Sequence, residues 1–285
     1  GANVATVGPG KVVSGNGKGG IFIDTSGNAI TVQGNFIGTN PTGTAALPNT
    51  WSGVFSRGTN IVVGGPLSTQ RNILSGNTLA GLEIENGSIT AQGNYIGTNA
   101  AGTTVLANLN QGVWVSGGSA VQLGGTVTGA GNLISGNGGE GIGIAGGTAI
   151  LEGNSIGSNA SASAYLPNQG GGVRVSGGTA HRIGGTATGA GNAIKGNKNS
   201  GIQINDGLSG IAILGNAIAA NTAVVSGSPH TALGIDLGTD TTNLGGVVNA
   251  NTGTTNGTKA NLAMNFPIFT AVALGPQILV TGYVG

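Results

Sequence analysis

A short phrase, Asn-x-Ile or Asn-x-Leu, recurs along almost the whole chain and constrains its fold more than any other feature. It alternates between two settings, GN(F/Y/S/A)IG and N(I/L/A)(L/I)(S/K)GN, and the full pattern returns every 60 residues, as Gly76, Gly136 and Gly196 show. A fixed repeat of this length indicates a solenoid, in which successive repeats stack on one another. The asparagines of the phrase are Asn35, Asn72, Asn94, Asn132, Asn154, Asn192 and Asn216.

Two other apolar patterns accompany the phrase in every coil. One is Gly-apolar-x-apolar, as at Ile142–Ile144, and the other is a further alternating stretch, as at Ile61–Val63. Alternation with period 2 is typical of strands, so each coil of about 30 residues offers three short strands. The sequence therefore predicts an all-β, right-handed parallel β-helix of about eight coils, two coils to each 60-residue repeat. We assign it residues 1–270, and we interpret residues 271–285 as a strand-like extension that begins a β-sandwich module or makes a subunit contact.

The asparagines of the phrase are expected to stack in one column. In a strand, residues i and i+2 share a face, so each asparagine points the same way as the Ile or Leu two residues later. Amides stacked at this spacing can hydrogen-bond one another and the backbone of the bend. We therefore expect Asn132→Ala or Asn154→Ala to destabilise the fold, and substitution of Asn168, in a long loop, to matter little. Ile144 and Ile156 should be buried on different walls of the coil.

Composition excludes several classes of protein. Of the 285 residues 61 are Gly, only 6% are charged, and the net charge is +1, so the chain carries no electrostatic footprint for nucleic acid. The absence of Cys excludes disulfides, thiol catalysis and Cys-based zinc sites. No apolar run is long enough to cross a bilayer, and we expect no cofactor and no metal. The opening residues read like the second half of a repeat, which indicates a processed segment of a larger, secreted protein.

Apparent catalytic motifs are explained by the repeat. GNGGEG matches G-x-G-x-x-G, but a strand rather than a helix follows it. GNSIG matches the G-x-S-x-G nucleophile motif, yet its repeat mates are GNFIG and GNYIG, so Ser155 merely takes the place of an aromatic residue at an outward position. His181 aligns with Val121 at an inward position and is expected to be hydrogen-bonded rather than a base. His230 is expected to be solvated.

The outward positions of the Gly-apolar-x-apolar strands form the most informative surface. In coil order they are Phe22, Phe55, Glu83, Trp114, Gly143, Arg174, Gln203 and Asp236. Aromatic residues on both sides of Glu83 could stack on sugar rings, or a loop, a partner module or another subunit could cover them. We take as a candidate carbohydrate or partner surface Phe22, Phe55, Glu83, Trp114, Arg174 and Asp236.

Charged residues near this column give weaker indications. Asp24, Arg57 and Glu85 align in successive coils as an acid–base–acid series, worth about 0–1 kcal/mol per exposed pair. Asp236 and Asp240 could bind calcium, although two carboxylates are a thin ligand shell.

Several phrases resemble those of a known family: GNLISGN, GNYIGTNAAGT, GTAALPN, GVWVSGG and TVTGAGNLISGN. They are similar to the repeats of bacterial extracellular right-handed parallel β-helix proteins, over residues 1 to about 270. The end, GIDLGTD…NLAMNFPIFTAVALG, resembles the exit from the helix in that family, where a β-sandwich module commonly follows. The resemblance implies the fold and not one function, because similar rods are surface adhesins, sheath or filament proteins, and polysaccharide-active enzymes.

We expect a secreted structural or surface protein, such as the subunit of a fibre, sheath or adhesin stalk, without a catalytic role. The acidic residues are scattered and lack the Lys or Arg set of a β-helix lyase. The alternatives are a carbohydrate-binding surface module and a polysaccharide lyase or glycoside hydrolase. The expected partners are further copies in a filament or sheath, flanking modules of a longer chain, or a polysaccharide. Four long loops should crowd one edge of the rod, where repeat proteins usually bind: Thr39–Gly53, Thr98–Gly112, Ser158–Gly171 and Ala219–Gly234.

Overall fold

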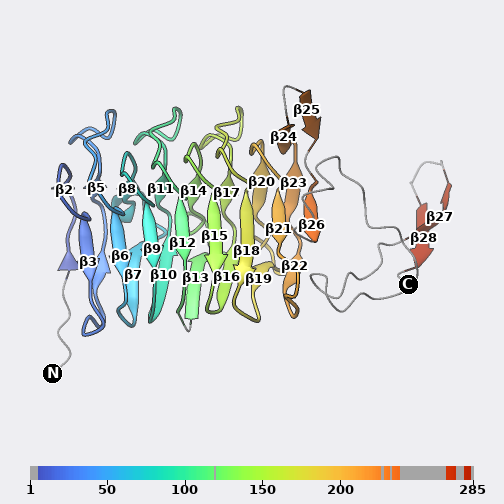
Figure 1. Ribbon diagram of the computed structural model, residues 1–285, viewed down its shortest axis with the longest axis horizontal. Coiled ribbons are helices and arrows are strands. Elements are labelled where there is room, and N and C mark those ends of the chain that lie inside the picture. The colour runs from blue at the N-terminus through green and yellow to red at the C-terminus, as the bar shows by residue number, and fades with distance from the viewer. Residues whose placement is uncertain are drawn as a thin grey trace.

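The chain folds into a parallel β-helix, as predicted. The computed structural model describes residues 6–118, 120–225, 228–231, 233–237, 268–273 and 279–283. Within them, three parallel sheets of eight strands each run side by side along one rod (Figure 1). Every coil contributes one strand to each sheet, and each strand pairs with the strand at the same position in the next coil.

The three sheets follow one another in each coil. Sheet A contains β1 (Thr6–Val7), β4 (Thr31–Val32), β7 (Ile61–Gly64), β10 (Ser88–Gln92), β13 (Ala120–Gly124), β16 (Ala149–Glu152), β19 (Arg182–Gly184) and β22 (Ala212–Leu214). Sheet B contains β2 (Val12–Val13), β5 (Phe36–Ile37), β8 (Ile73–Leu74), β11 (Tyr95–Ile96), β14 (Leu133–Ile134), β17 (Ser155–Ile156), β20 (Ala193–Lys195) and β23 (Ala217–Ala219). Sheet C contains β3 (Ile21–Ile23), β6 (Val54–Ser56), β9 (Leu82–Ile84), β12 (Val113–Val115), β15 (Ile142–Ala145), β18 (Val173–Gly177), β21 (Ile202–Ile204) and β26 (Ile235–Leu237).

A few elements stand outside the three sheets. One turn of 3-10 helix, η1 (Ser68–Gln70), lies between sheets A and B. The strands β24 (Thr222–Val225) and β25 (Ser228–Thr231) form an antiparallel hairpin in the fourth long loop. The strands β27 (Ile268–Ala273) and β28 (Leu279–Tyr283) pair with each other in an antiparallel sheet of their own.

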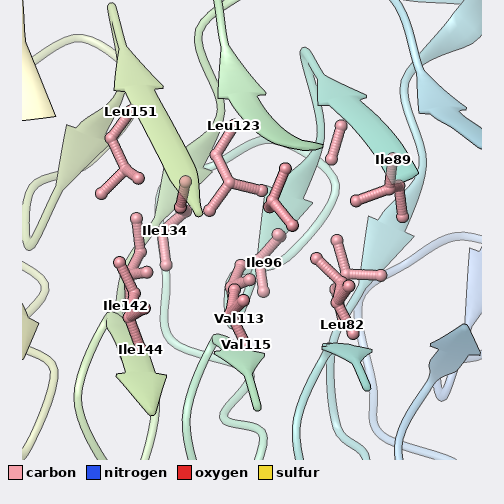
Figure 2. Packing of buried hydrophobic residues seen from close by; sticks show 14 of the residues in the cluster. Leu82, Ile89, Ile96, Val113, Val115, Leu123, Ile134, Ile142, Ile144 and Leu151 are labelled. Carbon is pink, nitrogen blue, oxygen red and sulfur yellow. The ribbon is translucent and has the colours of Figure 1, made fainter. Parts of the chain in front are cut away.

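The core is a narrow apolar column enclosed by the three sheets. Figure 2 shows Leu123 of sheet A, Ile96 of sheet B and Leu82 of sheet C among the side chains that meet there. Ile144 in sheet C and Ile156 in sheet B are both fully buried, so their expected placement on different walls is confirmed. Each such side chain stabilises the fold by about 1.5–3 kcal/mol.

The predicted asparagine column exists and is continuous. From Asn35 to Asn192, each side-chain Nδ2 donates to the Oδ1 of the next asparagine at 2.9–3.2 Å. It also donates to a main-chain carbonyl of the preceding coil, as Asn94 does to Val63. Each interior Oδ1 accepts the main-chain N–H of the preceding asparagine as well. All four hydrogen-bonding positions of an interior amide are therefore used. We call this column the first ladder.

A second asparagine ladder runs parallel to the first, at the corner between sheets B and C. Its members are Asn16, Asn49, Asn77, Asn108, Asn137, Asn168, Asn197 and Asn221. Neighbouring amides are joined Nδ2 to Oδ1 at 2.8–2.9 Å. From Asn49 onward, each Nδ2 also donates to a carbonyl of the preceding coil, as Asn168 does to Ile134 at 3.0 Å.

The expectation that Asn168 matters little is therefore wrong. Its side chain is fully buried and joins Asn137 to Asn197 in the second ladder. The long loop leaves the coil after sheet B and returns to it just before Asn168, so this residue belongs to the wall and not to the protruding part. A Leu-Pro-Asn or Leu-Ala-Asn phrase marks the same return in the other long loops, at Asn49 and Asn108.

The first three long loops gather at one edge of the rod, as predicted, and appear along its upper side in Figure 1. They also cover the outer face of sheet B. A Cβ atom on Gly43 would lie 2.9 Å from Cε1 of Phe36, and one on Gly102 would lie 2.8 Å from Cε2 of Tyr95. Successive loops are joined by a hydrogen bond from the Ala100 N–H to the Gly43 carbonyl. The loops therefore form a continuous outer layer.

The third long loop departs from this pattern in a correlated way. Ala162 stands where the other loops have Gly43 and Gly102, and all three adopt a left-handed backbone, with φ of 55°, 63° and 67°. Beneath it, Ser155 replaces the aromatic ring of the earlier repeats. The smaller serine leaves room for a Cβ atom, but the left-handed backbone remains unfavourable for alanine.

Replacing Asn168 tests the second ladder. Asn168→Ala removes two donors and one acceptor from a buried column, and the side chains of Asn137 and Asn197 each lose one hydrogen bond. We expect a loss of about 1–3 kcal/mol in the free energy of unfolding, similar to that of Asn132→Ala in the first ladder. Urea unfolding measures both. The exposed Asn110, in a long loop, is the control, and equal small effects at Asn168 and Asn110 would contradict the second ladder.

Ala162→Gly is expected to stabilise the protein. A left-handed alanine costs about 1–2 kcal/mol, which exceeds the 0.4–1 kcal/mol that glycine loses in chain entropy. The expected gain is thus about 0.5–1 kcal/mol, measured by thermal or urea unfolding. Gly102→Ala is the reverse control and should destabilise, because its φ is positive and the Tyr95 ring occupies the space of the new methyl group. A stabilising Gly102→Ala would refute this account of the loops.

Candidate binding surface on sheet C

The outward side chains of sheet C form the column that the sequence predicts. The register pairs Phe22 with Phe55, Phe55 with Glu83, and Glu83 with Trp114. It continues through Gly143, Arg174, Gln203 and Asp236. Parallel pairing fixes the spacing of this column at about 4.8 Å per coil, so neighbouring side chains are in reach of one another.

The first two members of the column are stacked aromatic rings. The Phe22 and Phe55 rings lie 5.1 Å apart between centroids and 3° from parallel. Phe22 remains 55% exposed. The Arg57 guanidinium lies 5.2 Å from the Phe55 centroid and pairs with Glu85 at 2.8 Å. Ring stacking and the cation hold this end of the surface in one arrangement.

The acid–base–acid series is formed only in part. The Arg57–Glu85 pair exists, but the Asp24 carboxylate accepts hydrogen bonds from the main-chain N–H and the hydroxyl of Thr25 instead. Asp24 follows the last residue of its strand directly and begins a turn, so its carboxylate is used locally.

Glu83 and Trp114, adjacent in the column, lean away from each other. The Ser52 hydroxyl donates to Oε2 of Glu83 at 2.5 Å. The Trp114 ring extends the other way and lies over Gly143. A Cβ atom added at Gly143 would lie 2.6 Å from Cε3 and 2.7 Å from Cζ3 of the indole. Between the two side chains is an open hollow of about 240 Å³, lined by Leu79, Ala80, Glu83, Asn110, Gln111 and Trp114. We call it the Glu83–Trp114 hollow.

A chain of polar contacts fixes one wall of the hollow. Nε2 of Gln111 donates to Oε2 of Glu140 at 3.2 Å, and Oε1 of Glu140 lies 3.6 Å from Nη1 of Arg174. Arg174 thus neutralises Glu140. Glu83 belongs to none of the ion pairs formed among the described residues, so its carboxylate gives the hollow a negative charge.

The end of the column near β26 is acidic. Nε2 of Gln203 donates to the Asp236 carboxylate at 3.4 Å. Burial raises the pKa of Asp236; the hydrogen bond from Gln203 opposes this, and the charge of Asp206 adds to it. The expectation of calcium between Asp236 and Asp240 falls partly on Asp240, which lies outside the described residues. The structure thus brings together Phe22 with Phe55 and Glu83 with Trp114, whereas Arg174 acts through Glu140 and Asp236 lies further along the rod.

Sequence reasoning missed Trp51 and the loop residues beside the column. Trp51 is 48% exposed, and the Nζ atom of Lys18 lies 5.8 Å from its ring centroid. It directly precedes Ser52, the partner of Glu83. The signal for it in the sequence is that Trp51 is one of only two tryptophans and stands at a position where the other coils have no aromatic residue.

His181 is buried in the wall, as expected. Nδ1 accepts the main-chain N–H of Ala149 at 3.2 Å, and Nε2 lies 3.0 Å from the Gly177 carbonyl, to which it donates in the neutral ring. Burial lowers the pKa of His181, and the hydrogen bond to Gly177 offsets this in part. The side chain of His230 lies outside the described residues.

Comparisons with known proteins add no relative: the sequence matches no family model, no curated protein and no solved structure. In the described part of the chain, no helix has the length and apolar character that crossing a membrane requires. The fold is a parallel β-solenoid with asparagine ladders.

The pH dependence of stability should report the buried His181. Its folded pKa lies below the ordinary value of about 6.5, so below that pH the unfolded chain binds a proton that the folded chain does not. The free energy of unfolding is therefore expected to decrease as the pH is lowered below about 6.5. The decrease is at most about 1.4 kcal/mol per pH unit and stops when the pH reaches the folded pKa. Urea unfolding between pH 7 and 5 measures this. His181→Val, which copies Val121, should flatten the slope, and an unchanged slope would contradict the assignment.

Proposed function

We propose that this chain is a structural rod of an extracellular surface, the subunit of a fibre or sheath or the stalk of an adhesin. The observation that supports this best is the unbroken pair of asparagine ladders. The second ladder joins eight successive coils from Asn16 to Asn221, and the first joins seven from Asn35 to Asn216. Together with three parallel sheets, these columns place hydrogen bonds along the axis of the rod in every coil.

Such an arrangement suits a protein that bears load or resists proteolysis. Pulling one coil from the next requires the simultaneous loss of strand hydrogen bonds and of buried amide bonds, each of which leaves an unsatisfied group worth about 1–3 kcal/mol. The low charge and the lack of cysteine are also compatible with a scaffold that depends on packing and hydrogen bonds alone.

The long-loop edge supports self-association as the mode of assembly. The segments 39–53, 98–112 and 158–171 contain no charged residue. They nevertheless expose large apolar side chains: Leu47, Trp51, Val105, Leu109 and Tyr165 are 46–63% exposed. Aromatic residues and few charges are the features that distinguish the central part of protein interfaces. A second rod offers the same uncharged edge with the same 60-residue period.

Carbohydrate binding is the second candidate function. It is favoured by the hollow that Glu83 and Trp114 line on the outer face of sheet C. An aromatic side chain next to a carboxylate and amides offers both an apolar and a hydrogen-bonding contact to a sugar ring. The hollow adjoins the long-loop edge, because Asn110 and Gln111, which line it, belong to the segment 98–112.

Sedimentation at micromolar concentration and electron microscopy test the rod proposal. We expect species well above the 27.2 kDa of one chain, or filaments. Val105→Glu should reduce the association, since it places a charge on the long-loop edge. Val127→Glu is the matched control, because Val127 is 60% exposed at another corner of the rod. Equal effects of the two substitutions would argue against the long-loop edge as the surface through which the rods associate. A clean monomer without polymer would reject the filament and leave a stalk, and turnover of a polysaccharide would reject the structural role.

A further inference from the structure

We propose that the Glu83–Trp114 hollow binds one pyranose ring and prefers a ring that carries an amino group. This inference rests on the second candidate function and names its site and ligand class. In this proposal the stacked pair Phe22–Phe55 is not the main contact with the sugar, and the binding site lies in the middle of the rod.

The first argument is the origin of the hollow. Neighbouring outward side chains in a parallel sheet normally fill the space between them, because they are about 4.8 Å apart. Here Glu83 is drawn toward Ser52 on one side. On the other side, Trp114 occupies the space over Gly143 that a side chain would otherwise fill. The hollow therefore arises because the column of side chains is interrupted at Gly143. Glu83 and Trp114, which flank the hollow, are both held away from the centre of the hollow.

The second argument is its size and lining. A volume of about 240 Å³ is below the roughly 300–1,000 Å³ of pockets for drug-sized ligands, so it suits a single ring. The indole gives an apolar wall, and the amides of Asn110 and Gln111 can donate and accept hydrogen bonds. Glu140 holds Gln111, and Arg174 in turn faces Glu140. This wall is thus ordered before a ligand arrives, which reduces the entropy lost on binding.

The third argument is charge. Glu83 lines the hollow and belongs to none of the ion pairs formed among the described residues. Arg174, the nearest cation of the wall network, is directed to Glu140 and is not among the lining residues. A carboxylate without a cationic partner attracts an ammonium group and repels a uronate or a sulfate. The expected order of affinity is therefore amino sugar, then neutral sugar, then anionic sugar.

Binding assays with the 285-residue chain test the proposal with three probes: oligomers of glucosamine, oligomers of glucose and oligomers of galacturonate. Calorimetry or affinity electrophoresis should rank them in this order. Trp114→Ala should weaken the first two by about tenfold or more, because loss of a central aromatic anchor has effects of this size. Glu83→Gln should remove the preference for glucosamine and retain binding of the glucose oligomer. Thermal unfolding confirms that the variants fold.

Gly143→Ala is the most selective variant, because it changes no residue that lines the hollow. The new methyl group overlaps the Trp114 ring and should push the indole into the hollow, so affinity should fall for both ligands. Phe22→Ala, in the same column but outside the hollow, should leave affinity unchanged. If Phe22→Ala weakens binding as much as Trp114→Ala does, the assignment of the binding site to the hollow is wrong, and the sugar binds along the wider column. A preference for galacturonate overturns the charge argument. If no probe binds the wild-type chain, both this inference and the second candidate function fail, and the rod proposal stands.

Discussion

The stacked amides of the two asparagine ladders are the interaction on which the rest of this structure depends. A buried amide that lacks partners costs about 1–3 kcal/mol, so a coil that carries one is stable only beside a coil that completes it. Each asparagine here bonds both to its neighbour in the ladder and to a carbonyl of the preceding coil. The ladders therefore fix the register of every coil on the next, in addition to filling the corners. The strands themselves could not do this alone, because those of sheet B contain only two or three residues.

With the register fixed, the repeat can vary on its outer faces without loss of the core. In two repeats an aromatic residue on sheet B is paired with a left-handed glycine in the loop above, and in the third repeat the pair becomes Ser155 and Ala162. A similar exchange occurs beside sheet A. Gln92 donates to the carbonyl of Gly124, whereas near Gly184 the donor is Arg182, which pairs with Glu152 at 2.7 Å. The second exchange keeps a hydrogen bond to the equivalent glycine carbonyl through a different donor. In both cases the substitutions within a repeat are correlated.

Periodicity was sufficient to predict the coil, the first ladder, the inward His181 and the order of the sheet C column, because each of these repeats with the strands. The second ladder was missed because the long loops insert residues between Ile156 and Asn168 and change the spacing from the strand. The hollow was missed for another reason. Its existence depends on the direction in which Glu83 and Trp114 lean, and the alignment of positions contains no information on side-chain direction. The loop residue Ser52, which draws Glu83 aside, lies outside every repeated phrase.

Function in such a rod is expected where the repeat is interrupted, because a perfectly periodic surface presents no unique site. The sheet C column shows this at Gly143. Its neighbours in the register, Trp114 and Arg174, are both large, and the glycine between them gives the indole a place to lie. Arg174 then reaches Glu140, which orders Gln111 on the loop beside the hollow. A single small residue thus determines where the Trp114 ring lies, while the ladders fix the register of the coils that carry it.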